Sequence, residues 1–425
     1  MSLPLHVGTA TALLIGVLAA SGEAQPAERR SARPGGPAGG ELRRLDGTRL
    51  SASAADAFAR RTLDSLGVTG AQIAVVNDGR LVWSAAYGLR GRASQAGGTD
   101  LPMRRTTTTW AASITKAVFA TYVMQLVERG AFDLDLPVAR QLPQPLDRYP
   151  AYREKAALLV ADPAWARVTP RMLLAHTAGL LNFATYEPDG RMRLHGTPGA
   201  AYRYSGEGIN LVGFIVEQRL GAPLDALMQA AVFGPAGMTR TSMVWRPELA
   251  DDVADRFGAD GQFLSQTRRS PARAAGSMTS SAEDLAAFVV ALFDGRLLPP
   301  ATRAAMLRPH VHIRTRAQFG PGADPADTLG GAEARAVGLA YGLGWGLLTS
   351  TRYGPAFFKE GHGDGAQTYL VCFERGRTCM AILTNSDNGE LAYRPLLETL
   401  VGASVIPWEW HGYTPAAIAA SRAGG

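Results

Sequence analysis

The chain has 425 residues, of which 46% are hydrophobic and 19% are charged. This composition is typical of a globular protein with a sizeable core, and it excludes an intrinsically disordered chain. The formal net charge is +6, but the basic residues are scattered and no run of them alternates with aromatic residues. We therefore expect no binding to nucleic acid.

The N-terminal segment has the pattern of an export signal. Residues 10–20 form an uncharged apolar run that is too short to cross a membrane. We predict a signal peptide over 1–24 and an exported protein, periplasmic or secreted, without stable membrane insertion after cleavage. A disordered Pro/Gly linker is predicted over 25–45 and one folded domain over 46–412. We expect residues 413–425 to form a flexible tail.

The first regular elements expected are a hairpin and a long helix. Residues 71–88 contain two strand-like runs around the Asn-Asp-Gly sequence at 77–79, which is a strong turn signal. An apolar-periodic helix is predicted over 113–129, and Gly130 is a good residue to end it.

Ser113 and Lys116 lie at the start of that helix, three residues apart and therefore on one face. A serine hydroxyl becomes a nucleophile only when a base takes its proton, and a desolvated lysine can be that base. The chain has only three lysines, at 116, 155 and 359. The alternative interpretation of the pair is an ordinary helix start with a solvated lysine.

The middle of the chain is predicted to be helical and its end to return to strands. Strands at both ends with helices between them predict an α/β (α+β) fold, in which one antiparallel sheet is formed by both chain ends, flanked by helices, with a mostly helical insertion. The expected helices span 169–179, 211–220, residues from 280 on, and 391–401; the expected strands span 341–348, 356–360, 369–374 and 378–384.

We expect no metal site at the cysteines or at His310 and His312. Cys372 and Cys379 flank a turn between two strands and would lie opposite one another. A disulfide and two free buried thiols both remain open for this pair. His310 and His312 lack a third ligand, so we expect no metal at them.

Five motifs in chain order resemble the serine β-lactamase-related superfamily. The similarity covers roughly residues 55–400 and points to the branch of class C β-lactamases, D-Ala-D-Ala carboxypeptidases and related esterases, with a penicillin-binding-protein-like fold. The motifs are Ser113-Ile-Thr-Lys116, Leu173-Leu-Ala-His-Thr-Ala-Gly-Leu180, Tyr204-Ser205-Gly206, Ala275-Gly-Ser-Met-Thr-Ser-Ser-Ala-Glu-Asp-Leu285 and Gly361-His362-Gly363-Asp364-Gly365.

The resemblance implies a serine hydrolase that acts through an acyl-enzyme and needs no cofactor. Ser113 would be the acylated nucleophile, with Lys116 and Tyr204 moving protons. The backbone N–H groups of Ser113 and Gly365 would hold the oxyanion. His362 would bind a substrate carboxylate or orient Tyr204.

Other positions that match the motifs are expected to bind substrate or support the fold. Gly206 and Asp364 stand at substrate-binding positions, and His176 is expected to be structural. Gly206 replaces the asparagine that the resemblance predicts, and Asp364 replaces a glycine. Glu207 follows Gly206 and could take over a polar contact, while Asp364 would either repel an anionic substrate or pair with an arginine.

These departures favour a carboxylesterase-like or D-amino-acid peptidase-like enzyme for a small-molecule or peptide substrate, without a strong carboxylate requirement. The alternatives are a class C-type β-lactamase or D,D-carboxypeptidase, and a catalytically silent penicillin-binding-like protein. An α/β-hydrolase is disfavoured because the chain has no Gly-x-Ser-x-Gly elbow. The substrate and the oligomeric state remain open.

Overall fold

The structure is a computed structural model that describes residues 38–92, 98–319, 323–324 and 331–423. The predicted signal peptide and most of the predicted linker lie outside the described residues. Within the described part of the chain, no helix is both long and apolar enough to cross a membrane.

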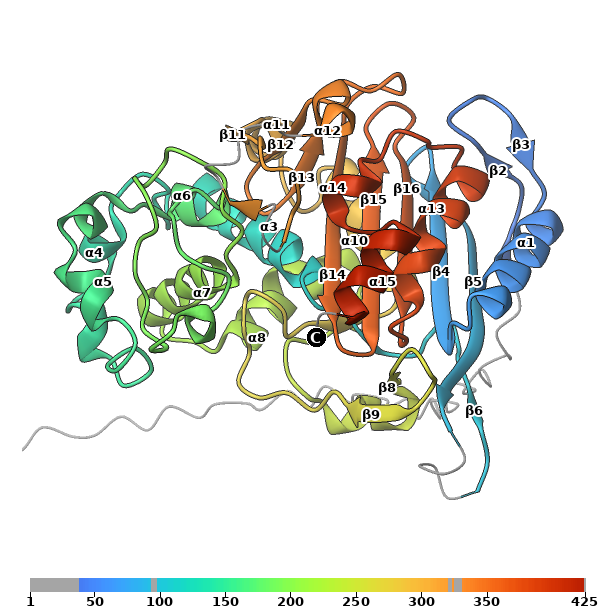
Figure 1. Cartoon of the computed structure of the whole chain (residues 1–425), viewed down its shortest axis with the longest axis horizontal. Coiled ribbons are helices and arrows are strands. Elements are labelled where there is room, and N and C mark those ends of the chain that lie inside the picture. Colours follow the sequence, from blue (N-terminus) through green and yellow to red (C-terminus); the bar gives the residue numbers. More distant parts are fainter. Residues whose placement is uncertain (1–37, 93–97, 320–322, 325–330, 424–425) are drawn as a thin grey trace, which may run out of the picture. The chain divides into compact units, whose positions relative to one another are not determined.

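An antiparallel sheet of ten strands forms the centre of the fold (Figure 1). The strand order is β1-β5-β4-β16-β15-β14-β13-β12-β11, and β6 pairs with β5. The two ends of the chain meet where β4 pairs with β16, with Ile73 opposite Ile382. This confirms the predicted fold class. The strands are β1 (Ala38–Gly39), β4 (Gly70–Asn77), β5 (Arg80–Gly91), β6 (Leu101–Pro102), β11 (Val311–His312), β12 (Leu339–Tyr341), β13 (Gly346–Leu348), β14 (Ala356–Gly363), β15 (Ala366–Phe373) and β16 (Thr378–Thr384).

Two turns show how local sequence shapes the sheet. Asp78 and Gly79 join β4 to β5 with φ values of 51° and 72°, as a tight hairpin turn requires. The single strand predicted over 341–348 is wrong, because the chain reverses there between β12 and β13. Gly344 has φ 78° in that turn, a conformation that favours glycine.

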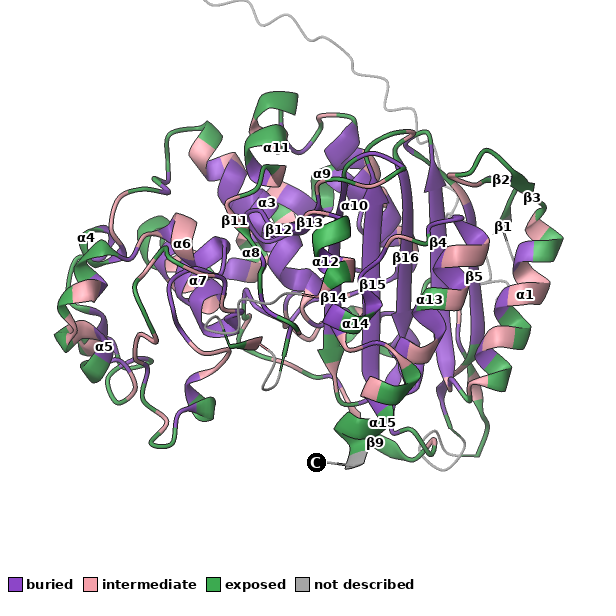
Figure 2. Cartoon of the chain, turned by 45° about the horizontal axis from the view of Figure 1, so that its top comes forward, coloured by how far each residue is buried: buried purple, intermediate pink, exposed green. Residues whose placement is uncertain are grey.

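Helices cover both faces of the sheet and create two hydrophobic cores. The helices α3 (Ile114–Glu128) and α10 (Ala282–Phe293) pack on one face, and α1 (Ala52–Ser65) and α13 (Gly389–Leu400) pack on the other. Alternate strand residues divide between the two cores, as Leu370 and Val371 do. Figure 2 shows the central strands buried along most of their length.

The region between β6 and β11 is mostly helical. Thr169 caps α6 by accepting a hydrogen bond from the amide of Met172, as predicted. The predicted extension of this helix to 179 is wrong, because His176 has φ 58° and the helix ends at Leu174. The elements of this region are β7 (Thr109–Trp110), α3, α4 (Val138–Gln141), α5 (Ala157–Ala161), α6 (Pro170–Leu174), α7 (Gly206–Leu220), α8 (Leu224–Met228), α9 (Gly234–Ala236), β8 (Asp255–Phe257), β9 (Phe263–Gln266), β10 (Thr279–Ser280), α10 and α11 (Pro300–Leu307).

Both predicted flexible boundaries contain ordered structure. Within the linker predicted over 25–45, β1 pairs with β5 and Leu42, on β2 (Leu42–Arg43), is fully buried against the α1 side of the sheet. Backbone pairing of this kind needs no apolar periodicity, so the pattern did not reveal it. The tail predicted over 413–425 contains α15 (Pro415–Ala423), and Tyr413 is buried in the same core, while Ile418 is also buried.

Cys372 and Cys379 form a disulfide between opposite positions of β15 and β16. The alternative of two free thiols is therefore excluded in this structure. The two Cα atoms lie 4.1 Å apart, the spacing of a pair that exchanges no backbone hydrogen bonds. Cys372 consequently directs its backbone groups toward β14.

Candidate active site

Ser113 stands at the entrance to α3, at a bend held by two short strands. The strand β7 pairs with β10 just before the bend, and Ala112 has φ 44°, a conformation that is rare for a residue with a side chain. Such strain is often found at functional sites. The bend leaves Ser113 partly exposed while most of α3 is buried.

Lys116 is buried and directed at the serine. Its Nζ lies 2.8 Å from Ser113 Oγ and 2.7 Å from the carbonyl oxygen of Ala275. Burial and the positive charge of Lys359 lower the pKa of Lys116 well below its ordinary value. This shift favours the neutral form of the amine, which can take a proton. The interpretation of Lys116 as a solvated lysine is wrong.

Tyr204 completes the group that the motifs predicted. The Nζ atoms of Lys116 and Lys359 lie 5.0 and 5.1 Å from the centre of its ring. Burial raises the pKa of Tyr204, while Lys359 and the side chain of Ser113 lower it by less, and the net shift is upward. Tyr204 is thus a neutral phenol, which can donate a proton.

Lys359 is the main site residue that sequence reasoning missed. It is fully buried on β14 and forms an ion pair with Glu360. Burial opposes the charge of Lys359, but the carboxylate of Glu360 and the Tyr204 hydroxyl outweigh this effect and raise its pKa. The sequence carries a signal for it, because penicillin-binding-type sites have a Lys-x-Gly or His-x-Gly strand motif, and Lys359-Glu360-Gly361 fits it three residues before His362-Gly363.

Gly361 brings β14 against the start of α3. A Cβ atom at Gly361 would lie 3.0 Å from the amide nitrogen of Ser113. The strand β13 pairs with β14 only as far as Phe358, so beyond it one edge of β14 is free. Cys372 of β15 directs its backbone groups toward β14, so it forms a hydrogen-bonded pair with Phe357. Every second residue of β14 after Phe357 also bonds to β15, which includes Gly361. His362 lies between two such positions, so its N–H points to the free edge.

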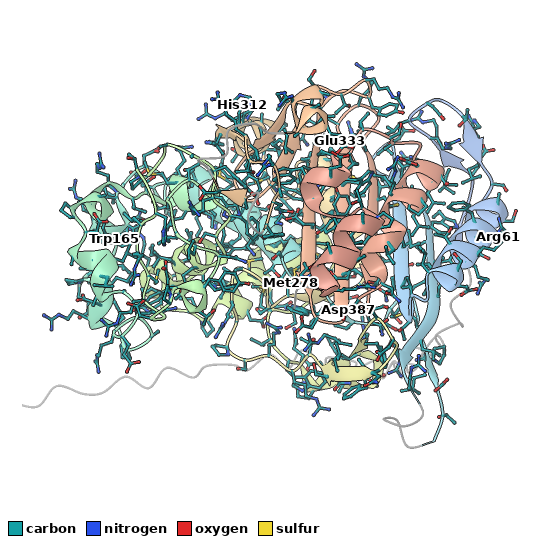
Figure 3. All side chains as sticks on the ribbon, viewed as in Figure 1. Arg61, Trp165, Met278, His312, Glu333 and Asp387 are labelled. Carbon is teal, nitrogen blue, oxygen red and sulfur yellow. A yellow bond between two sulfur atoms is a disulfide. The ribbon has the colours of Figure 1, made fainter. Side chains whose placement is uncertain are left out.

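Gly365 does not occupy the position predicted for it. Its amide nitrogen donates to Oδ1 of Asp387 at 2.5 Å, and its φ of 67° places it in the turn between β14 and β15. Figure 3 labels Asp387 near this end of the sheet. The amide is therefore not free to bind an oxyanion, and the N–H of His362 takes its place as the candidate.

The ring of His362 points away from Tyr204. Strand alternation puts Lys359 and Gly361 on the α3 face of β14, and His362 on the opposite face. Its Nδ1 lies 2.6 Å from Oε1 of Glu390, whose carboxylate outweighs the effect of burial and raises the pKa of the imidazole. The expectation that this ring orients Tyr204 is wrong.

Gly206 begins α7, and the packing around it leaves no room for a side chain. A Cβ atom there would lie 2.9 Å from the ring of Phe183. Its amide donates to Oδ1 of Asn182 at 2.8 Å. Glu207 forms an ion pair with Lys155, so it does not take over the contact considered for it.

Asp364 and His312 lie outside the immediate site, whereas His176 packs against Tyr204. Asp364 is exposed in the β14–β15 turn, where its carbonyl oxygen accepts a hydrogen bond of 2.6 Å from Arg256. His176 is buried with its ring 4.4 Å from that of Tyr204, and its Nδ1 accepts from the amide of Ser205. His312 lies at the surface (Figure 3). No cluster of three or more metal-ligating side chains occurs among the described residues.

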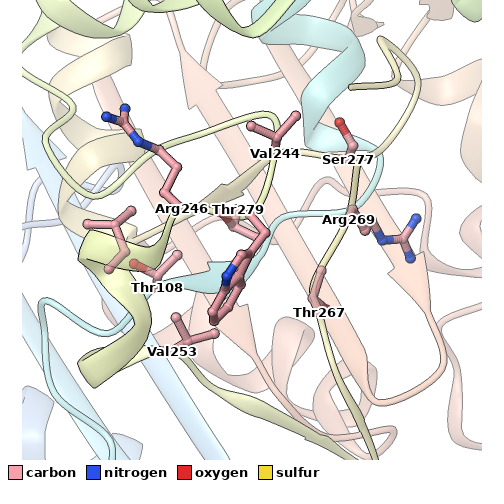
Figure 4. A pocket seen from close by; sticks show the side chains of 10 residues that line it. Thr108, Val244, Arg246, Val253, Thr267, Arg269, Ser277 and Thr279 are labelled. Atoms are coloured by element: carbon pink, nitrogen blue, oxygen red, sulfur yellow. The ribbon is translucent and has the colours of Figure 1, made fainter. Parts of the chain in front are cut away.

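The pocket drawn in Figure 4 is next to this site and separate from it. It is lined by Thr108, which precedes β7, by Thr279 on β10, by Val253 and Ser277, and by side chains of the segments 244–249 and 267–269. Ser113, Lys116 and Tyr204 are not among its lining residues.

A sheet built from both chain ends with a helical middle is the fold of the penicillin-binding proteins. The chain belongs to the Beta-lactamase family, which it matches over residues 55–403. It is 31% identical to Esterase EstB of Burkholderia gladioli over 46% of this chain and 53% of that protein. It is 27% identical to Penicillin-binding protein 4 of Amycolatopsis lactamdurans over 79% and 85% of the two chains.

The chain thus spans about half the length of the esterase. The solved D-amino acid amidase of Ochrobactrum anthropi SV3 superimposes with a TM-score of 0.60 at 23% identity, covering 87% of this chain and 99% of that one. This similarity shows a shared fold. Members of the family are serine hydrolases.

Proposed function

We propose that this protein is a serine hydrolase that transfers the acyl group of an ester or amide to Ser113 and then to water. The observation that carries the proposal is the buried amine of Lys116, 2.8 Å from Ser113 Oγ and with a pKa well below its ordinary value. A neutral amine at this distance is a general base for the hydroxyl.

Each proton in the proposed cycle has a donor and an acceptor. Lys116 takes the proton of Ser113 as Oγ attacks the carbonyl carbon, and Tyr204 gives its proton to the leaving group. Lys116 then returns the first proton to Tyr204. The N–H groups of Ser113 and His362 receive the oxyanion, and removal of such a donor costs about 3–4 kcal/mol in a protease. Water then takes the place of Ser113 as the nucleophile. Lys116 takes a proton from the water as its oxygen attacks the acyl carbon, Tyr204 gives its proton to Oγ of Ser113, and Lys116 returns its proton to Tyr204.

Ester or amide hydrolysis is preferred to β-lactam or D,D-peptide hydrolysis on one observation. Gly206 carries no side-chain amide, and Phe183 and Asn182 occupy the space that one would fill, with Oδ1 of Asn182 already accepting a hydrogen bond from the amide of Gly206. The similarity to a protein named as an esterase supports the same choice. Rapid turnover of nitrocefin that is abolished in Ser113→Ala would contradict it.

A catalytically silent binding protein remains the second candidate, and covalent labelling separates the two. A fluorophosphonate should label the wild-type protein at Ser113 and leave Ser113→Ala unlabelled. Lys116→Ala should fold normally and hydrolyse p-nitrophenyl butyrate more slowly by orders of magnitude. Wild-type protein that neither reacts with the probe nor hydrolyses any ester would refute the proposal.

We also propose that the protein is exported. The apolar run over 10–20 and the Cys372–Cys379 disulfide support this, because disulfides persist in oxidising compartments. Fractionation of the native cells should place the protein, without residues 1–24, in the periplasm or the medium. Recovery of the uncut chain from the cytoplasm would contradict it.

A further inference from the structure

Two arginines lie over the ring of Trp110, three residues before the proposed nucleophile. The Cζ atom of Arg269 is 3.9 Å from the ring centre, and that of Arg256 is 5.0 Å from it. Both side chains are only partly buried, so a ligand in solution can reach them. Figure 4 shows the guanidinium of Arg269 directed away from Val253 and Thr108, and so out of that pocket.

Trp110 is fixed between the two segments that also border the nucleophile. Its Nε1 donates to the carbonyl oxygen of Gly276 at 2.6 Å, and a Cβ atom at Gly363 would lie 2.3 Å from the ring. Beside the nucleophile, Nζ of Lys116 donates to the carbonyl oxygen of Ala275, the residue before Gly276. A Cβ atom at Gly361, two residues before Gly363, would lie 3.0 Å from the amide nitrogen of Ser113. The positions on β14 that contact Ser113 and Trp110, Gly361 and Gly363, are two residues apart. Measured along the strand, Trp110 is therefore about 7 Å from Ser113.

Arg269 has no carboxylate partner within the part of the chain that the structure describes. Among the described residues, its guanidinium has no hydrogen-bond acceptor or acidic partner, whereas Arg256 donates to the carbonyl oxygen of Asp364. Burial, Arg256 and Arg273 lower the pKa of Arg269, and no carboxylate opposes them, whereas Asp364 and Asp387 act to raise the pKa of Arg256. An arginine stays charged at neutral pH all the same. Partial burial of an unpaired charge is unfavourable, and a bound anion would relieve it.

We propose that Arg269, stacked on Trp110 beside Arg256, binds a carboxylate on the acyl part of the substrate. Trp110 lies about 7 Å from Ser113 along β14, so this carboxylate would lie between the guanidinium and the reacting carbonyl. The substrate class is then a half-ester or half-amide of a short dicarboxylic acid. This inference rests on the proposed acyl transfer to Ser113. It reverses the expectation, drawn from Gly206 and Asp364, of an enzyme without a strong carboxylate requirement.

The test compares two esters that differ in this charge. Mono-p-nitrophenyl glutarate places a carboxylate four bonds from the reacting carbonyl, and p-nitrophenyl hexanoate has similar length without charge. In Arg269→Gln, kcat/KM should fall roughly tenfold more for the glutarate than for the hexanoate, chiefly through KM. Arg269→Lys should recover part of this difference.

Arg268→Gln is the matched control, because Arg268 is exposed and stacks on Trp245 instead of Trp110. It should leave the ratio of the two kcat/KM values unchanged. An equal loss for both esters in Arg269→Gln would mean that Arg269 only supports Trp110, and no loss would mean that the carboxylate does not reach it. Either result would overturn the inference.

A binding measurement keeps the inference separable from the proposed function. Glutarate should raise the melting temperature of Ser113→Ala and should not raise that of the Ser113→Ala/Arg269→Gln double variant. Failure of this difference would overturn the carboxylate subsite even if esters are hydrolysed. A positive result with no Ser113-dependent hydrolysis would refute only the proposed enzyme.

Discussion

Removal of the positive charge of Lys359 tests the electrostatics of the site most directly. The Nζ atoms of Lys116 and Lys359 are each about 5 Å from the centre of the Tyr204 ring, so they are at most about 10 Å apart. At an effective dielectric constant of about 20, two unit charges 10 Å apart repel by about 1.7 kcal/mol, or about 1.2 pKa units. In Lys359→Gln the pKa of Lys116 should therefore rise by at least about one unit.

The assay is the pH dependence of kcat/KM for p-nitrophenyl butyrate. Only the neutral amine of Lys116 can act as the base, so activity increases as pH rises through its pKa. The acidic limb of the profile should move to higher pH in Lys359→Gln, whatever happens to the maximal rate. Circular dichroism at each pH excludes unfolding as the cause.

The double variant Lys359→Gln/Glu360→Gln is the control, because Glu360 raises the pKa of Lys116 and Lys359 lowers it. Removal of both charges should shift the limb by less than Lys359→Gln alone. An unchanged limb in Lys359→Gln, or a shift to lower pH, would refute the assignment of Lys116 as a base controlled by Lys359.

Three further predictions concern stability. Burial lowers the pKa of His411 to about 4 in the folded protein, below its unfolded value, so only the unfolded state takes up its proton as pH falls from 6.5 to 4. The free energy of unfolding of the wild type therefore decreases as pH falls. His411→Phe has no imidazole, so its free energy of unfolding, measured in urea, should decrease by about 3 kcal/mol less between pH 7 and pH 4. An identical decrease in the two proteins would contradict this. The Cys372→Ala/Cys379→Ala variant should be less stable by about 2 kcal/mol, and a reductant should not destabilise it further; an unchanged urea midpoint would contradict this. Gly206→Asn should destabilise by about 1–3 kcal/mol and should be partly rescued by Phe183→Ala, unless Phe183 moves freely aside.

Local sequence determined the features that depend on neighbours along the chain. The turn at Asp78-Gly79, the cap at Thr169 and the helix that follows Ser113 were all predictable, because each depends on contacts within four residues. The placement of Lys116 beside Ser113 is of this kind, since three residues along a helix return to the same face.

The tertiary structure decided which groups are charged and which amides are free. Lys359 is about 150 residues from Tyr204, and no local pattern reports that strand β14 carries it into the same buried site. His362 and Gly365 were misplaced because the direction of each side chain and amide depends on strand alternation and on which neighbouring strand is present. Burial and long-range charge set the pKa values of the two lysines in opposite directions, and both effects exist only once the chain is folded.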